Sequence, residues 1–472
     1  MQQPANYDEW KAWAQAEDRR TGADLWKLTD RTRLYDFAVI RRRHDELVEV
    51  RRSGDPHRLL YYLNEGVHGN MGGMGSPALY ARARFGTKDL VRQYTDEVVA
   101  ALHDLEDADE RAIGPDQKLA FFLRAKDCFG RSALMLSGAG SLGAFHMGVA
   151  RALAEQDLVP KVVSGASAGA IVAAIIGTHA SGELASLFSP SGFASSFAAF
   201  IDPRRTSWKR RRLQLENLSA LVESTIPDMT FIEAFEETGR HLNVSVAPAA
   251  AQQRSRLLSA ATSPNALIRE AVMASCAIPG LFPPVTLAAK DFEGRRRPYV
   301  PSRKWVDGSI TDDLPAKRLA RLYGVNHFIS SQANPIVLWA LQDPQRQRSL
   351  ASRLGSIGLK ASRDALRTIY PFAMDFVRDL HPLNTWTRLW FGVMAQEYTA
   401  DITILPSRRL YDPMMLLAQL STEEAEGLLR DGEASTWPKI EMIRICTRIG
   451  RCIDGTLARL QNWDGRREAV PA

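Results

Sequence analysis

The first 130 residues carry apolar side chains at intervals of three and four, the spacing of one face of an α-helix. The clearest stretch holds Leu90, Tyr94, Val98, Leu102 and Leu105. Segments rich in Gly, Pro, Ser and Asp at 53–56, 69–77 and 113–116 interrupt this region. The pattern predicts an N-terminal helical domain over residues 1–130.

From residue 132 onward, short apolar runs alternate with glycine-rich turns and helical stretches. This alternation is typical of a mainly parallel sheet with helices on both faces. The expected strands cover residues 133–136, 162–164, 242–246, 305–306, 327–330 and 402–405. We expect an α/β domain over residues 131–345 and a helical C-terminal part over residues 346–472, whose strand 402–405 is a candidate member of the same sheet. Helical spacing of Trp386, Leu389, Trp390, Phe391, Val393 and Met394 favours packing in that part over a ligand groove.

Composition agrees with a folded, multidomain chain: 472 residues with 45% hydrophobic and 24% charged side chains exclude a disordered or fibrous protein. The longest strictly apolar run, residues 170–176, is shorter than the roughly 18 residues that cross a bilayer. The first residues lack the basic and apolar segments of a secretion signal, so we expect a cytoplasmic protein. The spacing of Cys128, Cys276, Cys446 and Cys452 matches no zinc signature, so we expect neither disulfides nor metal, and no cofactor.

The segment with the strongest chemical signal is Gly165-Ala166-Ser167-Ala168-Gly169, between an expected strand and the apolar residues 170–176. A G-x-S-x-G sequence in this position is typical of a nucleophile elbow, whose tight turn exposes the serine hydroxyl at the start of a helix. Ser167 is therefore a candidate nucleophile, with Gly165 and Gly169 required by the turn. The alternative is a small-residue turn with an ordinary surface serine.

A second glycine-rich turn, Ser137 to Gly143, also follows an expected strand and has two interpretations. As G-x-G-x-x-G it could bind a dinucleotide, but that fold requires an acidic residue at the end of the next strand, where this chain has the serine turn. Alternatively, the N–H groups of Gly138, Ala139 and Gly140 form an oxyanion hole. Because both turns follow neighbouring strands, we expect them at the same edge of the sheet.

A serine nucleophile requires a base, and the best candidate is Asp307, which ends the expected strand Trp305-Val306 and precedes Gly308. An ordinary Asp-Gly turn is the alternative. His327 lies within an apolar run and His381 precedes a proline, so structural roles are favoured for both histidines.

Together these segments resemble the patatin-like phospholipase family. The stretches 136–146, 274–282 and 326–335 are similar to the intracellular triacylglycerol lipase branch, and residues 1–130 are similar to the DUF3336-like helical domain that precedes its catalytic domain. The resemblance implies a patatin-like three-layer α/β/α sandwich and a Ser-Asp dyad without histidine. It further implies hydrolysis of glycerolipid esters, with Ser167 as nucleophile and Asp307 as base.

Carried over by position, the resemblance assigns the oxyanion hole to the loop containing Gly138, Ala139, Gly140 and Gly143. The chain departs from the family at Leu142, where an arginine is usual, and at Ser309, where glycine or alanine is usual. Two other functional classes remain open: a Ser-His-Asp esterase of the α/β-hydrolase type, and a catalytically silent lipid-binding protein. The choice among triacylglycerol, phospholipid and lysophospholipid also remains open.

The net charge is +6, and one basic cluster has no acid within it. The cluster consists of Arg204, Arg205, Lys209, Arg210, Arg211 and Arg212, and it follows Phe188, Phe193, Phe197 and Phe200. Apolar side chains beside positive charge predict peripheral binding to an anionic membrane or lipid-droplet surface. The alternative is that the phenylalanines are core residues and the basic run is solvated. A nucleic-acid partner is not expected, because no binding module surrounds the cluster.

Overall fold

The computed structural model describes residues 4–189, 192, 215–250, 255–309, 312–338, 400–408 and 419–468. The chain divides into two compact units, each discontinuous in sequence. One contains residues 1–132, 323–327 and 438–472, and the other contains residues 133–322 and 328–437. The last division falls at Pro438 inside helix α19 (Thr422–Glu468), where the helix lacks one backbone N–H donor. The expected C-terminal part therefore contributes residues to both units.

The first unit is helical. Its helices are α1 (Tyr7–Thr21), α2 (Ala23–Leu28), α3 (Phe37–Arg52), α4 (Pro56–Asn64), η1 (Met71–Gly73), α5 (Pro77–Tyr80), α6 (Asp89–Asp107) and α7 (Pro115–Phe129), with the second part of α19. The apolar stripe of α6 predicted from the sequence is buried, with exposed fractions of 3% or less at all five positions. The helical N-terminal region is thus confirmed.

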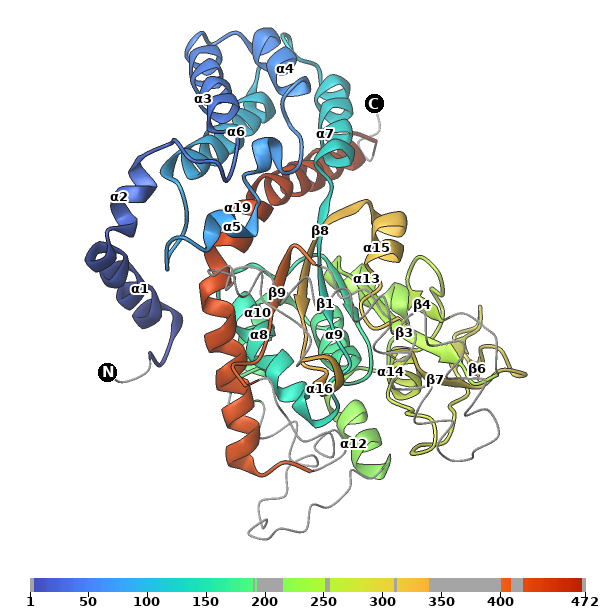
Figure 1. The fold of residues 1–472 in the computed structure, drawn as a ribbon. Helices are drawn as coiled ribbons and strands as arrows, with labels where there is room; N and C mark the ends of the chain where they lie inside the picture. The colour runs from blue at the N-terminus through green and yellow to red at the C-terminus, as the bar shows by residue number, and fades with distance from the viewer. Residues whose placement is uncertain are drawn as a thin grey trace, which may run out of the picture. The chain divides into compact units, whose positions relative to one another are not determined.

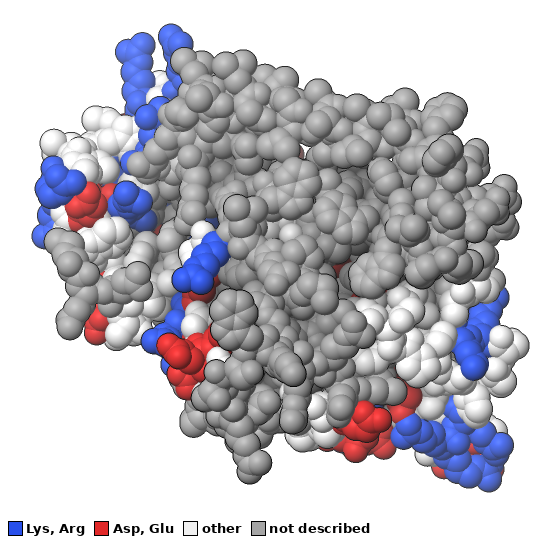
Figure 2. All heavy atoms as spheres, turned by 60° about the horizontal axis from the view of Figure 1, so that its bottom comes forward, with Lys and Arg blue, Asp and Glu red and all other residues white. Residues whose placement is uncertain are grey.

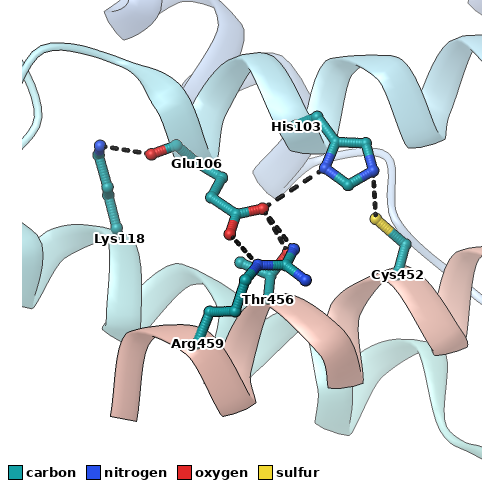
Figure 3. A network of polar contacts seen from close by, with 6 residues as sticks. All are labelled: His103, Glu106, Lys118, Cys452, Thr456 and Arg459. Carbon is teal, nitrogen blue, oxygen red and sulfur yellow. Dashed lines mark hydrogen bonds and ion pairs between the residues drawn. The ribbon is translucent and has the colours of Figure 1, made fainter. Parts of the chain in front are cut away.

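A polar network joins α6 to the second part of α19 within this unit (Figure 3). The Arg459 guanidinium donates to both carboxylate oxygens of Glu106 at 2.6 and 2.7 Å, and the Thr456 hydroxyl donates at 2.8 Å. These bonds, led by that from Arg459, lower the pKa of Glu106. Lys118 Nζ donates to the Glu106 carbonyl at 2.7 Å and so satisfies the C-terminus of α6. The second part of α19 is therefore an integral part of the helical unit.

A central sheet organises the second unit (Figure 1). Its strands are β1 (Arg131–Leu136), β2 (Val162–Gly165), β3 (His241–Pro248), β4 (Arg256–Ser259), β7 (Trp305–Asp307), β8 (Val325–Ser331) and β9 (Ile402–Ile404). Among the described residues the order is β4-β3-β2-β1-β8-β9, with β7 also paired to β3. The β1–β2, β2–β3 and β8–β9 pairs are parallel, whereas β4 and β7 run antiparallel to β3. The predicted α/β fold with a mainly parallel sheet is confirmed.

Helices cover this sheet, and a separate hairpin is formed by β5 (Ala288–Lys290) and β6 (Arg296–Pro298). The helices are α8 (Gly143–Ala154), α9 (Ala168–Thr178), α10 (Ser181–Leu187), α12 (Leu215–Thr225), α13 (Phe231–Thr238), α14 (Ile268–Ser275), α15 (Ala316–Tyr323) and α16 (Pro335–Leu338). Helix α9 packs on β2 and β3, and all its residues are buried. A fully apolar helix of this kind belongs to the core of a large domain.

Charged side chains of the described residues lie next to one another in several places on the face in Figure 2. On the β5–β6 hairpin, Arg295 and Arg297 pair with Asp291, and Arg296 pairs with Glu270.

Two groups of residues singled out in the sequence lie outside the described residues. They are the predicted basic cluster 204–212 with Phe193, Phe197 and Phe200, and the C-terminal apolar positions Trp386, Leu389, Trp390, Phe391, Val393 and Met394. Phe188 is described and is buried, which favours the core interpretation for that side chain. In the described ranges, no helix is both long and apolar enough to traverse a bilayer.

The contact between α8 and the first part of α19 depends on two glycines. A Cβ atom at Gly148 would overlap the Leu429 carbonyl, and one at Gly432 would overlap the Phe145 carbonyl. We predict that Gly148→Ala lowers the free energy of unfolding by ~3 kcal/mol, because the helices must separate to admit a methyl group. Thermal or urea unfolding measures the change. The matched control is Gly182→Ala, since nothing lies within 4 Å of the added Cβ there; equal stabilities of the two variants would contradict the packing argument.

Candidate active site

The two glycine-containing turns lie side by side because β1 and β2 end level with each other. Leu136 pairs with Gly165 in parallel register, so the loop 137–143 and the Ser167 turn leave the same sheet edge. They also touch: a Cβ atom at Gly143 would lie 3.0 Å from the Cβ of Ala168. The carboxyl edge of a parallel sheet is the usual ligand site of α/β folds.

Asp307 reaches this edge because of the pairing of β3. Strand β2 pairs with residues 241–244 of β3, whereas β7 pairs with residues 246–248, just beyond the end of β2. Val246 pairs with Arg256 of β4 as well as with Asp307, and a strand residue has one neighbour on each edge, so β7 must share the β2 edge. Gly165 pairs with Val244, and Asp307 pairs with Val246, two residues further along β3. Asp307 is therefore level with Ser167, which lies two residues beyond Gly165.

Ser167 has the strained backbone expected of a nucleophile elbow. Its φ of 52° and ψ of −126° lie outside the regions that residues other than glycine normally adopt. The neighbouring glycines are sterically required, because a Cβ at Gly165 would overlap Gly169 and a Cβ at Gly169 would overlap the Leu136 carbonyl. The Ser167 N–H donates to Ser275 Oγ at 2.9 Å, and the Ser275 hydroxyl donates to the Ser245 carbonyl at 2.7 Å. This relay from α14 to β3 stabilises the turn.

The side chain of Ser167 lies close enough to Asp307 to affect the pKa of that carboxyl group. Asp307 is 2% exposed and Ser167 is 6% exposed. Burial raises the pKa of Asp307 to about 6, while hydrogen bonds from Ser309 and Ser167 oppose the rise. The Ser309 N–H lies 2.8 Å from Asp307 Oδ1. At neutral pH the Asp307 carboxylate is thus ionised, and it is more basic than an ordinary aspartate, as a general base requires.

Some backbone N–H groups of the loop 137–143 form hydrogen bonds within the protein, and others have no acceptor among the described residues. The Gly138 N–H donates to Asp313 Oδ1 at 2.6 Å, and the Gly143 N–H closes a turn onto the Gly140 carbonyl. For Ala139 and Gly140 no N–H acceptor is found within the described ranges. Of the four amides expected to form an oxyanion hole, the two at Ala139 and Gly140 are available in this geometry.

The start of the loop is held by the end of β8. The Ser137 N–H donates to the Ser331 carbonyl at 3.1 Å, and the Ala333 N–H donates to Ser137 Oγ at 3.0 Å. His146 bridges the same residues, with Nε2 at 2.9 Å from the Ser137 carbonyl and Nδ1 at 2.7 Å from Ser331 Oγ. Since a carbonyl only accepts, Nε2 carries the proton and Nδ1 accepts from Ser331. Burial lowers the pKa of His146 to about 4, so it is neutral and structural.

The two histidines considered as alternative bases are His327 and His381, and the structure brings neither of them to Ser167. His327 lies near the beginning of β8, and its Nδ1 is 3.0 Å from Ser132 Oγ near the beginning of β1. Ser167 follows the opposite, carboxyl end of β2. His381 lies outside the described residues.

The two departures from the family pattern have local explanations. Leu142 is fully buried, so this position contributes to the core. Ser309 donates to Asp307 through its N–H and its hydroxyl. A glycine or alanine at this position would have only the N–H to donate. Gly308 has no room for a side chain, because a Cβ atom would overlap the Ser245 backbone.

Three polar residues of the site were not predicted: Ser275, His146 and Asp313. Ser275 and His146 lie in stretches that carry the family resemblance, but nothing in their spacing indicates hydrogen bonds to the serine turn and the glycine loop. Asp313 follows Asp307 by six residues, and its sequence neighbours do not distinguish a buried carboxyl from a solvated one. Among the described residues, no group of three or more His, Cys, Asp or Glu side chains is arranged to hold a metal.

The raised pKa of Asp307 implies that its charge destabilises the fold. Folding raises the pKa, so the folded state binds more protons than the unfolded chain between pH ~4 and ~6, and stability falls as pH rises through this window. We predict that Asp307→Asn increases the free energy of unfolding by ~2 kcal/mol at pH 7.5, with little change at pH 4. Urea unfolding at both pH values measures this difference; a less stable variant at pH 7.5 would contradict the assignment of a buried charge.

Two protein-family models and several known proteins are similar to this chain. Residues 134–320 match the patatin-like phospholipase family model, and residues 1–127 match a domain of unknown function, DUF3336. Triacylglycerol lipase ptl2 of Schizosaccharomyces pombe is 31% identical over 487 residues, covering 97% of this chain and 77% of the relative.

Two further relatives are longer than this chain. Triacylglycerol lipase 4 of Saccharomyces cerevisiae is 34% identical over 94% of the chain, and triacylglycerol lipase SDP1L of Arabidopsis thaliana is 31% identical over 94%. The chain spans about half the length of each, 51% and 56%. Similarity to ptl2 over 97% of this chain and 77% of the relative, with the family-model match over residues 134–320, shows that this chain belongs to the patatin-like phospholipase family.

Proposed function

We propose that this protein is a serine acyl hydrolase that releases fatty acids from glycerolipids. The observation that supports it most is the strand register that places Ser167 level with the buried Asp307, at the sheet edge that also carries the Ala139 and Gly140 amides. A nucleophile, a base and oxyanion donors at one sheet edge are the parts that ester hydrolysis requires.

In the first half-reaction, Asp307 accepts the hydroxyl proton as Ser167 Oγ attacks the ester carbonyl carbon. The N–H groups of Ala139 and Gly140 stabilise the resulting oxyanion. Collapse of the tetrahedral intermediate breaks the bond to the glycerol oxygen, which takes the proton from Asp307 and leaves as an alcohol. In the second half-reaction, Asp307 accepts a proton from water, the hydroxide attacks the acyl-serine, and the fatty acid leaves as Ser167 regains a proton.

We propose triacylglycerol as the preferred substrate because three relatives over 94% or more of this chain are named triacylglycerol lipases. Phospholipids and lysophospholipids carry the same ester bond, so a panel of defined lipids distinguishes them. A histidine-dependent esterase is disfavoured because both ring nitrogens of His146 are engaged and His327 lies beside Ser132. A silent binding protein is disfavoured because binding alone does not require the strained backbone of Ser167.

We further propose that the enzyme acts while bound peripherally to an anionic membrane or lipid-droplet surface. The support comes from the sequence, in which six basic residues between 204 and 212 follow a phenylalanine-rich segment. Each basic side chain near an anionic surface contributes about 1 kcal/mol of attraction.

Substitution of the dyad tests the proposed chemistry. Ser167→Ala and Asp307→Asn should each lower kcat for fatty-acid release by ~10³-fold or more, because one removes the nucleophile and the other its base. In the wild type, kcat/KM should rise with pH to a plateau above pH about 6, since Asp307 must be ionised. The control is His327→Ala, which should retain activity. Full activity of the Ser167 variant would refute the mechanism, and loss of activity in His327→Ala as well as in Ser167→Ala would favour a triad.

Neutralising the basic cluster tests the surface proposal. Replacing all six residues with glutamine should weaken binding to vesicles containing phosphatidylserine by ~10²-fold or more and reduce its salt dependence, because the electrostatic attraction is removed. Cosedimentation at two salt concentrations measures both effects. Hydrolysis of a short-chain soluble ester should remain unchanged, which separates surface binding from chemistry. Unaltered vesicle binding would show that the cluster is a solvated segment.

A further inference from the structure

A second buried carboxyl group lies beside the dyad and contacts the glycine loop. Asp313 is 1% exposed, and its Oδ1 accepts the Gly138 N–H at 2.6 Å. The approach is tight: a Cβ atom at Gly138 would lie 2.9 Å from Ser309 Cβ and 3.5 Å from Asp313 Oδ1. The segment after β7 thus packs directly against the first peptide of the loop.

Residues that follow β8 lie near the Asp313 carboxyl. The side chains of Gln332 and Asn334 are close enough to lower its pKa slightly. Both are buried, the Asn334 N–H donates to Gln332 Oε1 at 3.1 Å, and the Gln332 N–H donates to the Ile404 carbonyl of β9 at 3.0 Å. Through these contacts, the glycine loop is connected to the β8–β9 side of the sheet at a second point, beside the Ser137 contacts.

We propose that Asp313 is a positioning residue for ester hydrolysis: its carboxyl group orients the Ser137–Gly138 peptide so that the following N–H groups of Ala139 and Gly140 face the oxyanion. The inference rests on the proposed hydrolase function. Gly138 places no side chain between the two groups, and its amide is committed to Asp313 rather than to substrate. An oxyanion donor contributes a factor of ~10² to 10³, so a misplaced peptide should be detectable.

The surroundings of Asp313 favour a neutral carboxylic acid. Burial, and to a smaller extent the charge of Asp307, raise the pKa of Asp313 to about 8, whereas Asp307 itself has a pKa of about 6. Among the described residues, the other ionisable groups of this region do not supply a counter-charge. His146 is neutral, and Asp312 pairs with Arg318 at 3.0 Å. Near neutral pH one carboxyl of the two is therefore ionised, and the uncharged one can be replaced by an amide of the same shape.

Comparison of an amide with a truncation tests the proposal. Asp313→Asn keeps an oxygen that accepts the Gly138 N–H, so kcat on a soluble ester at pH 7 should stay within ~3-fold of the wild type. Asp313→Ala removes the acceptor, and kcat should fall by ~10²-fold with KM changed less than ~3-fold, because the loss affects the transition state. The matched control is Asp312→Ala, which removes an adjacent carboxyl without touching the loop and should retain kcat. Thermal unfolding of each variant identifies any that fails to fold.

The pH profile separates a positioning role from a merely structural one. Above pH about 8, ionisation of Asp313 places a second negative charge beside the site, so wild-type kcat should decline, and the decline should be absent in Asp313→Asn. Identical alkaline limbs in the two proteins, or a folded Asp313→Ala variant with wild-type kcat, would overturn the proposal. Those results would leave the hydrolase intact, whereas an inactive wild type would refute the proposed function itself.

Discussion

The site depends on the pairing of a three-residue strand. Strand β3 extends past the end of β2, and β7 occupies the edge that β2 leaves unpaired. Because β7 runs antiparallel, its last residue is the one nearest the end of β2, which brings Asp307 level with Ser167. Three ladder pairs therefore determine whether a carboxylate meets the nucleophile, and the buried Trp305 at the other end of β7 contributes to holding this short strand in register.

Local signals in the sequence were sufficient for the elements that build the site, since the expected strands at 133–136 and 162–164 correspond to β1 and β2 within two residues. The glycine at 165 also reflects a local steric requirement, because its added Cβ would overlap Gly169 and Ala170 of the same turn, whereas the requirement at Gly169 comes from Leu136 and Ser137 at the end of β1. Strand β4 was not expected, because a four-residue antiparallel edge strand has too short a pattern to distinguish from a loop.

The contacts that position Ser167 and the glycine loop could not be predicted from local sequence patterns, because they join residues far apart in the chain. Ser275 reaches the Ser167 amide across 108 positions of sequence, and Asp313 reaches Gly138 across 175. Short polar residues such as these look alike in sequence whether they are solvated or buried, and only tertiary packing decides which amide each one meets. The oxyanion loop shows the consequence: four amides were expected from sequence, and hydrogen-bonding geometry leaves the donors of Ala139 and Gly140 without an acceptor in the part of the chain that is described.

Electrostatic interactions give the two buried carboxyl groups, Asp307 and Asp313, different pKa values. Two buried carboxyl groups close to each other cannot both ionise readily, because each charge raises the free energy of the other in a medium of low polarity. The Ser309 N–H donates to Asp307 and so favours the charged form of that carboxyl, whereas the charge of Asp307 disfavours ionisation of Asp313. The proton therefore resides on Asp313, and the base remains beside the nucleophile. A base of raised pKa is stronger than an ordinary aspartate, so in the proposed mechanism the burial that destabilises the folded chain also makes Asp307 a stronger base for Ser167.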